Sequence, residues 1–363
     1  MSYSPFLTPG QSRNRRRLAA RRRRRRQRLA ALGVLLLIAG ALLGGMAIAS
    51  GSHKPRRRGI HASAPSAHRH PAPAPRLSPH GFPLAKPALT LGGISNPERD
   101  PVQVSFKDPP RAGILFNLTT GQVLWQRNPY LHLPIASLTK MMTALLTVQS
   151  APPDAHVLVT RQAVDMPGSK VGVLPVGHHV RLESLLYGLL LPSGNDAAVA
   201  LAQHVAGNVN AFVTRMNEEA AALGLGCTRF SSPSGYYDKG NYSCVADLAV
   251  LAHEDMRQPR IARVVHTYAA VIPFPIHGGK LYLYNNNPLL IYRYPGATGM
   301  KTGQTEAAGR CLVATAERHG VRLGTIVLHS EEPGTQAREL LDLGFEDVYH
   351  QPVVPEAPFP PGA

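Results

Sequence analysis

Acidic residues are missing from the first 97 positions of this 363-residue chain, although those positions hold 18 of its 39 lysines and arginines. The remaining residues, 98–363, carry 21 basic and 22 acidic side chains, so the formal net charge of +17 belongs to the N-terminal part. The rest of the chain is close to neutral. It also lacks zinc-ligand spacing and an aromatic stripe mixed with basic residues, which argues against a nucleic-acid reader.

Charge of either sign is missing from residues 29–49, LAALGVLLLIAGALLGGMAIA, which follow eleven arginines between Arg13 and Arg28. A helix of this length spans a hydrocarbon core of about 30 Å. The positive-inside rule makes residues 1–28 a basic cytoplasmic arm and places everything after the span outside. Two alternatives stay open: an uncleaved single-pass anchor in the cell membrane, and a signal peptide cleaved after Ala47-Ile48-Ala49, which would give a secreted protein. Both export the rest of the chain.

Hydrophobic periodicity is missing from residues 50–91, which are rich in Pro, Ala, Ser and His. Such a segment cannot bury a core, so it is expected to be an extended linker. Its histidines have no fixed spacing and are not expected to bind metal. Residues 347–363 are expected to be a disordered tail. The folded domain is therefore predicted over residues 92–346, and the sequence shows no internal repeats.

Cysteines are few, and all three lie on the exported side: Cys227, Cys244 and Cys311. Cys311 falls in the apolar run CLVATA and is expected in a buried strand. Cys227 and Cys244 flank a turn-rich loop, and an exported chain permits a disulfide between them, but the sequence does not decide whether it forms. A catalytic cysteine is not expected, because no histidine is placed nearby as its partner.

The order of the expected elements indicates the fold class. Residues 112–128 and 309–330 alternate apolar and polar positions around turns, as two β-hairpins do. Between them, helices are expected from Ser137 to about Gln149, over 182–190, 197–205 and 209–223, and from a cap at Ser243 to about Met256, with a last helix over 334–345. Strands first, helices next and strands again predict an α+β domain with an antiparallel sheet assembled from both ends.

Three short motifs follow one another along the folded part: Ser137-Leu138-Thr139-Lys140, then Ser193-Gly194-Asn195, then Lys301-Thr302-Gly303. S-x-x-K alone is a weak signal, and Ser-Gly-Asn alone is common turn chemistry. The three in this order are much more specific.

The sequence resembles the serine D-alanyl-D-alanine carboxypeptidases, the low-molecular-weight penicillin-binding proteins of peptidase family S11. The resemblance covers roughly residues 100–346 and extends beyond the triplets. The matching stretches are GILFNLTTGQVLWQRNPYLHLPIASLTKMMTALL, LLLPSGNDAAVALAQHVAG, FVTRMNEEAAALG and YPGATGMKTGQTEAAGRCLVATA. It implies the β-lactamase/transpeptidase-like fold, in which helices flank an antiparallel sheet and form an all-helical subregion.

The chemistry of Ser137 and Lys140 is consistent with this family. Ser137 at a helix start faces the positive end of the helix dipole, and Lys140 lies one turn further on the same face. A neutral lysine amine can take the serine proton and so activate the hydroxyl. Burial of Lys140 and a second cation, Lys301, across the cleft are expected to lower the pKa of Lys140.

The resemblance also implies roles for the other motif residues. Ser193 relays a proton to the leaving amine, and Asn195 holds both the substrate and Lys140. Lys301 and Thr302 engage the terminal carboxylate, while Gly303 lets the substrate backbone approach the strand. The backbone N–H groups of Ser137 and Gln304 form the oxyanion hole. No metal or cofactor is implied.

The chain departs from the family pattern in several places. Ser232–Gly235 replaces Asn-Pro-His-Gly, Cys244 stands where the family has Thr, and Asn286 lies in a stretch where some relatives carry an arginine for the carboxylate. Well-known members also have a C-terminal β-domain and anchor helix, so anchoring is expected at the N-terminus here.

The expected activity is removal of the terminal D-Ala from peptidoglycan stem pentapeptides through an acyl-enzyme on Ser137, with β-lactams as acylating mimics. D,D-endopeptidase and transpeptidase activities use the same motifs and stay open, as do the residue preferred at the third stem position and the oligomeric state. One alternative is a non-catalytic wall-binding scaffold on the same fold. Another is a β-lactamase, which needs a loop Glu that the stretch CTRFSSPSGYYDK lacks. A membrane-tethered nucleic-acid binder is opposed by the neutral exported part.

Overall fold

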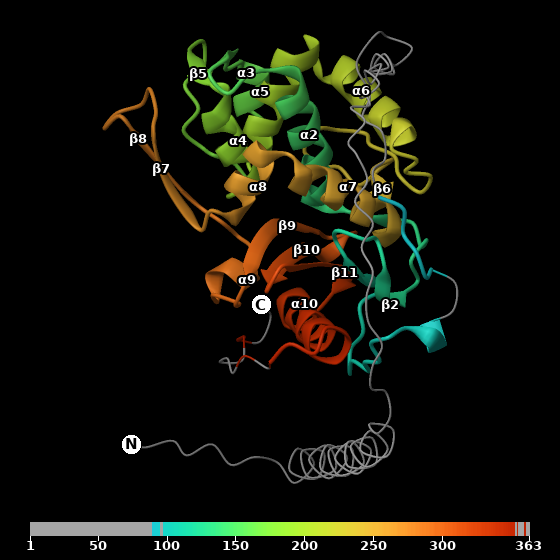
Figure 1. Cartoon of the computed structure of the whole chain (residues 1–363). Helices are drawn as coiled ribbons and strands as arrows, with labels where there is room; N and C mark the ends of the chain where they lie inside the picture. The colour runs from blue at the N-terminus through green and yellow to red at the C-terminus, as the bar shows by residue number, and fades with distance from the viewer. Residues whose placement is uncertain (1–88, 95–96, 353, 355–358, 361–363) are drawn as a thin grey trace, which may run out of the picture. The chain divides into compact units, whose positions relative to one another are not determined.

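A five-stranded antiparallel sheet combines strands from the two ends of the domain (Figure 1). In spatial order the strands are β2 (Val123–Arg127), β1 (Ala112–Asn117), β11 (Val321–Ser330), β10 (Gly309–Arg318) and β9 (Ala297–Thr305). Successive side chains of a strand point to opposite faces. Accordingly Ile114 and Phe116 belong to one buried apolar cluster and Leu115 to another. Both faces of the sheet are therefore covered, and β9 and β2 are its edges.

The description covers residues 89–94, 97–352, 354 and 359–360 of a computed structural model. The predicted cytoplasmic arm (1–28), membrane segment (29–49) and most of the predicted linker (50–91) lie outside these residues. Within the described ranges, no helix has both the length and the apolar character needed to cross a bilayer. Leu89, at the end of the predicted linker, is buried in the main apolar cluster.

Helices pack on both faces of the sheet. On one face lies α10 (Pro333–Leu343), whose Ala337, Leu340 and Leu341 are fully buried against the sheet. On the other lie α7 (Val245–Arg257) and α8 (Pro259–His266), and α2 (Lys140–Ser150) packs on both of these helices. The remaining long helices, α4 (Leu182–Leu190), α5 (Asn195–Ala206) and α6 (Val209–Ala222), form a helical subregion beyond α2. This arrangement confirms the predicted α+β class and its all-helical part.

Local sequence signals explain where several of these helices begin and end. The side chain of Asn208 accepts a hydrogen bond from the backbone N–H of Ala211 and so caps α6. Gly224, in the left-handed region at φ 72°, follows the end of the same helix. The cap predicted at Ser243 is wrong by one residue, because Cys244 is the N-cap of α7. Ser243 instead pairs with Leu133 in a short sheet.

Shorter elements connect these layers. They are η1 (Pro97–Arg99), η2 (Ala136–Thr139), α3 (Arg161–Val164), α9 (Pro288–Ile291), η3 (Gly344–Val348), and the strand pairs β3 (Leu133–Pro134) with β6 (Tyr242–Ser243), β4 (His156–Leu158) with β5 (His179–Arg181), and β7 (Ala269–Pro273) with β8 (Lys280–Tyr284). The predicted tail, 347–363, is described only in part. Its Phe359 is buried, with its ring 4.9 Å from that of Tyr292.

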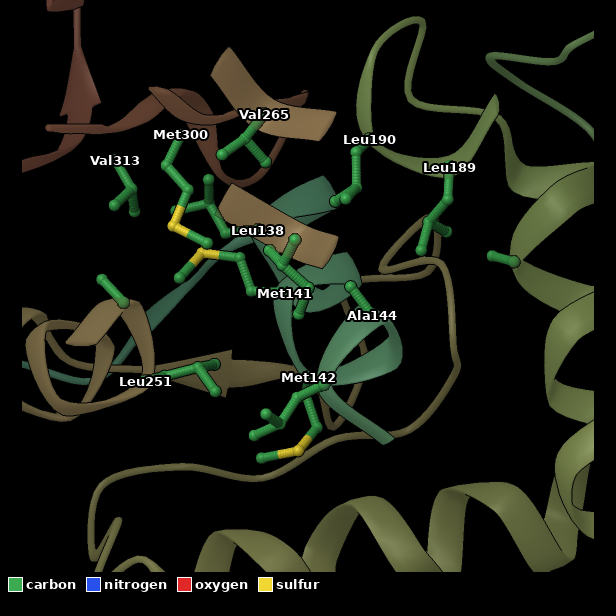
Figure 2. Packing of buried hydrophobic residues seen from close by; sticks show 14 of the residues in the cluster. Leu138, Met141, Met142, Ala144, Leu189, Leu190, Leu251, Val265, Met300 and Val313 are labelled. Atoms are coloured by element: carbon green, nitrogen blue, oxygen red, sulfur yellow. The ribbon is translucent and has the colours of Figure 1, made fainter. Parts of the chain in front are cut away.

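The main apolar cluster reaches the residues beside the sequence motifs. Leu138 and Met141, which flank Lys140, lie in the same cluster as Met300, which precedes Lys301 (Figure 2). Val265 from α8 and Val313 from β10 complete this part of the packing. Truncating a buried Leu or Met to Ala typically costs about 2–5 kcal/mol. The core that stabilises the fold therefore also fixes η2 and β9 relative to each other.

Candidate active site

Ser137 and Lys140 lie at the junction of η2 and α2. The Nζ atom of Lys140 is 2.8 Å from Oγ of Ser137, 2.8 Å from Oδ1 of Asn195 and 2.8 Å from the carbonyl oxygen of Ser234. The two carbonyl-type oxygens can only accept hydrogen bonds. A neutral amine has two N–H groups and one lone pair, so it can donate to both oxygens and accept the proton of the Ser137 hydroxyl. The arrangement therefore suits Lys140 to act as a base toward Ser137.

Burial keeps both lysines of the site from holding a charge easily. The side chain of Lys140 is fully buried, and burial is the largest cause that lowers its pKa well below the usual value, followed by the charge of Lys301. Asp196 acts in the opposite direction. Burial also lowers the pKa of Lys301 to about 7. The lowered pKa favours the neutral amine of Lys140, which is the form that can accept a proton.

The Ser193-Gly194-Asn195 motif lies between α4 and α5. Ser193 has a left-handed backbone conformation, φ 66°, which is uncommon for a residue with a side chain. Its buried Oγ has no hydrogen-bond partner among the described residues. Asn195 donates from Nδ2 to the carbonyl of Pro167 at 2.6 Å, which orients its Oδ1 toward Lys140. Strained backbone and unpaired buried polar atoms tend to collect at functional sites.

The Lys301-Thr302-Gly303 motif lies on the edge strand β9, as expected. Its strand pairs with β10 on one side only, which leaves the other edge open toward η2. A Cβ atom added at Gly303 would lie 2.9 Å from the carbonyl oxygen of Ile135 and 3.2 Å from the backbone nitrogen of Ser137. Only glycine therefore lets β9 approach the nucleophile so closely.

Two cavities meet at Ser137. One, of about 430 Å³, is lined by Ser193, Thr302, Gly303 and Arg310 among others. The second, of about 460 Å³, is lined by Asn195, Tyr236 and Tyr237 among others. Both cavities share three residues: Ser137, Ser169 and Gln304. Ser137 thus borders both cavities.

A profile of the peptidase S11 family, described as D-alanyl-D-alanine carboxypeptidase, matches residues 108–332. This chain belongs to that family. It is 32% identical to the D-alanyl-D-alanine carboxypeptidase DacF of Bacillus subtilis over 251 residues, which is 67% of this chain and 64% of DacF. It is 36% identical to DacB2 of Mycobacterium tuberculosis over 245 residues, or 65% of this chain and 82% of DacB2. The match to DacF thus spans less than two thirds of that relative.

A solved structure shows the same likeness. The crystal structure of the Streptomyces K15 DD-transpeptidase superposes with a TM-score of 0.63 at 32% identity, over 67% of this chain and 99% of that one. The S11 fold therefore extends through the helical subregion and the sheet.

Three residues that contact Lys140 or border the two cavities were not found from the sequence. Ser234 contributes only its carbonyl oxygen, to which Lys140 donates, so the missing histidine in Ser232–Gly235 does not alter this contact. Ser169 borders both cavities, but it lies in a Pro-Gly turn that carries no chemical signal. Arg310 faces Gln304 on the neighbouring strand, and only strand pairing, not spacing, brings it to the site.

Asn286 and the cysteines also have definite places. Asn286 lines the first cavity beside Thr302 and Gln304. Cys311 is buried in β10, as predicted, and all three cysteines are free thiols in the structure.

Proposed function

We propose that this S11 protein is an exported serine D-Ala-D-Ala carboxypeptidase that removes the terminal D-Ala from peptidoglycan stem pentapeptides. The observation that supports it best is the contact of the buried Lys140 amine with the Ser137 hydroxyl, 2.8 Å apart at the meeting point of two cavities. Lys140 takes the proton as Oγ attacks the penultimate carbonyl. No step in this scheme needs a metal or a cofactor.

The developing oxyanion would be stabilised by the backbone N–H groups of Ser137 and Gln304, both of which border the two cavities. Losing one such donor typically raises the barrier by about 3–4 kcal/mol. Ser193 lines the first cavity, and its buried Oγ has no partner among the described residues. It would pass a proton to the leaving amine. Water then hydrolyses the acyl-enzyme and restores the Ser137 hydroxyl.

The terminal carboxylate of the substrate would bind at the cavity wall formed by β9 and β10. Thr302 offers a hydroxyl there, Arg310 a guanidinium, and the buried Lys301 an amine whose pKa burial lowers to about 7. A guanidinium can bind a carboxylate through two parallel hydrogen bonds. β-Lactams carry a carboxylate next to a reactive acyl group, so we expect them to acylate Ser137 as well.

Export rests on the sequence pattern alone. The uncharged residues 29–49 after the arginine-rich residues 1–28 support either a membrane anchor or a signal peptide. In both cases the catalytic domain would face the peptidoglycan.

The decisive experiment uses the full chain and a stem pentapeptide ending in D-Ala-D-Ala. We expect stoichiometric release of free D-Ala from the wild type and none above background from Ser137→Ala. The proposal would be wrong if the wild type released no D-Ala, or if the wild type and Ser137→Ala released equal amounts. A labelled penicillin that fails to attach to the wild type would favour the non-catalytic scaffold instead.

Transpeptidase, endopeptidase and β-lactamase activities can be told apart by two observations. One is the acceptor of the acyl group, and the other is the lifetime of the penicillin adduct. The Streptomyces K15 protein is named a DD-transpeptidase, so added amine acceptors should be included. Cross-linked product in place of free peptide would indicate transpeptidation, and cleavage of cross-linked dimers would indicate endopeptidase activity. Rapid turnover of penicillin would indicate a β-lactamase, whereas a long-lived adduct is expected here.

A further inference from the structure

Cys227 and Cys244 face each other across an antiparallel pair of segments. Arg229 and Tyr242 exchange two backbone hydrogen bonds, of 2.9 and 3.0 Å. One residue outward, the hydroxyls of Thr228 and Ser243 lie 2.7 Å apart. The same register places Cys227 directly opposite Cys244.

This register suits a covalent link between the two cysteines. Residues directly opposite each other in antiparallel segments have Cα atoms about 4.5–5.5 Å apart, which falls within the range found across disulfides. The two Sγ atoms and a carboxylate oxygen of Asp247 all lie within 4.8 Å of one another. A small side-chain movement therefore brings the sulfurs to bonding distance.

We propose that Cys227 and Cys244 form an intramolecular disulfide when the chain folds in the presence of a disulfide oxidant. The thiolate of Cys227, which retains 9% exposure, attacks a small disulfide such as oxidised glutathione and releases one glutathione thiolate. The thiolate of Cys244 then attacks Sγ of Cys227 and releases the second. Two cysteine thiols are oxidised, two glutathione thiols are formed, and the two cysteine protons pass to them.

The disulfide would restrict the motion of a loop that contacts the active site. Its closed loop, Cys227–Cys244, contains Ser234, whose carbonyl accepts a hydrogen bond from Lys140. The same loop pairs with Leu133 and Pro134 in β3, shortly before Ser137. Cross-linking its base would reduce the freedom of both contacts. This consequence rests on the proposed function, but the link itself does not.

Burial raises the pKa of both thiols, so the folded dithiol should react slowly. The test therefore starts from reduced, denatured full-length protein, which is refolded in buffers of graded ratios of reduced to oxidised glutathione. After acid quenching and alkylation, we expect a product that has lost two hydrogens and a cross-linked peptide joining Cys227 to Cys244. Cys311 should be alkylated only after denaturation. The oxidised form should melt roughly 5–10 °C above the reduced form, given the usual effect of closing a loop of this size.

Cys227→Ala, Cys244→Ala and Cys311→Ala serve as matched variants. The first two should lose the cross-linked peptide and the redox-dependent shift in melting temperature, whereas Cys311→Ala should keep both. The proposal is overturned by three alkylatable thiols under every ratio, by a link that involves Cys311, or by a stoichiometric metal ion bound to both thiols. The disulfide is detected by mass spectrometry of the cross-linked peptide. Its test therefore gives a clear answer even if the protein releases no D-Ala.

Discussion

The side-chain oxygen of Asn195 lies 2.8 Å from Nζ of Lys140, and both atoms belong to buried side chains. The uncharged amide therefore orients the amine without placing a negative charge beside it. Asn195→Asp would place a carboxylate at the same distance and raise the pKa of Lys140. We expect the acid limb of the kcat/KM profile for D-Ala release to move to higher pH, with activity at pH 7 falling at least tenfold.

Asn195→Leu is the matched control, because it also removes the hydrogen bond to Pro167 but adds no charge. It should lower activity without moving the acid limb upward. If both variants leave the limb where the wild type has it, Lys140 is not the group whose protonation limits the reaction.

Lys301 should reduce the stability of the protein at neutral pH. Burial lowers its pKa from 10.5 to about 7, so between those values the unfolded chain binds a proton that the folded protein lacks. The free energy of unfolding should therefore rise with pH across this window and be lowest, for this group, below about pH 7. Lys301→Met should abolish activity but raise the free energy of unfolding at pH 7 by about 1–3 kcal/mol.

Urea unfolding of wild type and Lys301→Met between pH 6.5 and 10 provides the measurement. The wild type should show the steeper rise with pH, and some slope should remain in the variant because the pKa of Lys140 is lowered in the same way. Parallel curves would mean that Lys301 is charged in both states.

Local sequence signals predicted much of the fold. The helix over 182–190 was predicted with the bounds of α4, because its apolar run has clear ends. The cap at Ser243 was wrong because the hydroxyl is used by Thr228 across the loop, a contact that no local pattern reveals. Order along the chain predicted an antiparallel sheet from both ends of the domain, but spacing alone could not give its strand order.

The site shows the same division. The motifs predicted a shared place for Ser137, Lys140 and Lys301, since their chemistry depends on side chains. Ser234 was missed because it acts through its backbone carbonyl, which any residue carries. Arg310 was missed because its position follows from pairing with Gln304. A single sequence does not reveal contacts that the backbone makes, or contacts that depend on which residues of two strands are paired.

Gly303→Ala should impair acylation without preventing folding. The new Cβ would lie 2.9 Å from the Ile135 carbonyl and 3.2 Å from the Ser137 nitrogen, so β9, which carries the Gln304 donor, must move away from the Ser137 donor. We expect the rate of labelling by a fluorescent penicillin to fall at least tenfold. Gly226→Ala is the control, because a Cβ there meets nothing within 4 Å. Equal labelling rates for Gly303→Ala and the wild type would show that β9 can accommodate the extra methyl group without disturbing the site.

Arg310 should determine affinity for the substrate carboxylate. It borders the same cavity as Ser137 and Thr302, and its Nη1 donates to the carbonyl of Glu331 at 3.0 Å, which holds the guanidinium at the rim. Arg310→Gln should raise KM for a peptide ending in D-Ala-D-Ala about tenfold and change kcat little, because the lost hydrogen bonds exist before and during acylation.

A peptide with an amidated C-terminus separates this effect from a general disturbance, since it has no carboxylate for Arg310 to bind. Its turnover should be slow with the wild type and no slower with Arg310→Gln. Arg322→Gln on β11 is a matched arginine control, whose nearest carboxylate is that of Glu317 at 3.7 Å, and it should leave both substrates unaffected. An equal loss with the acid and the amide would mean that Arg310 supports the strand instead of binding the carboxylate, and recognition would then rest on Lys301 and Thr302.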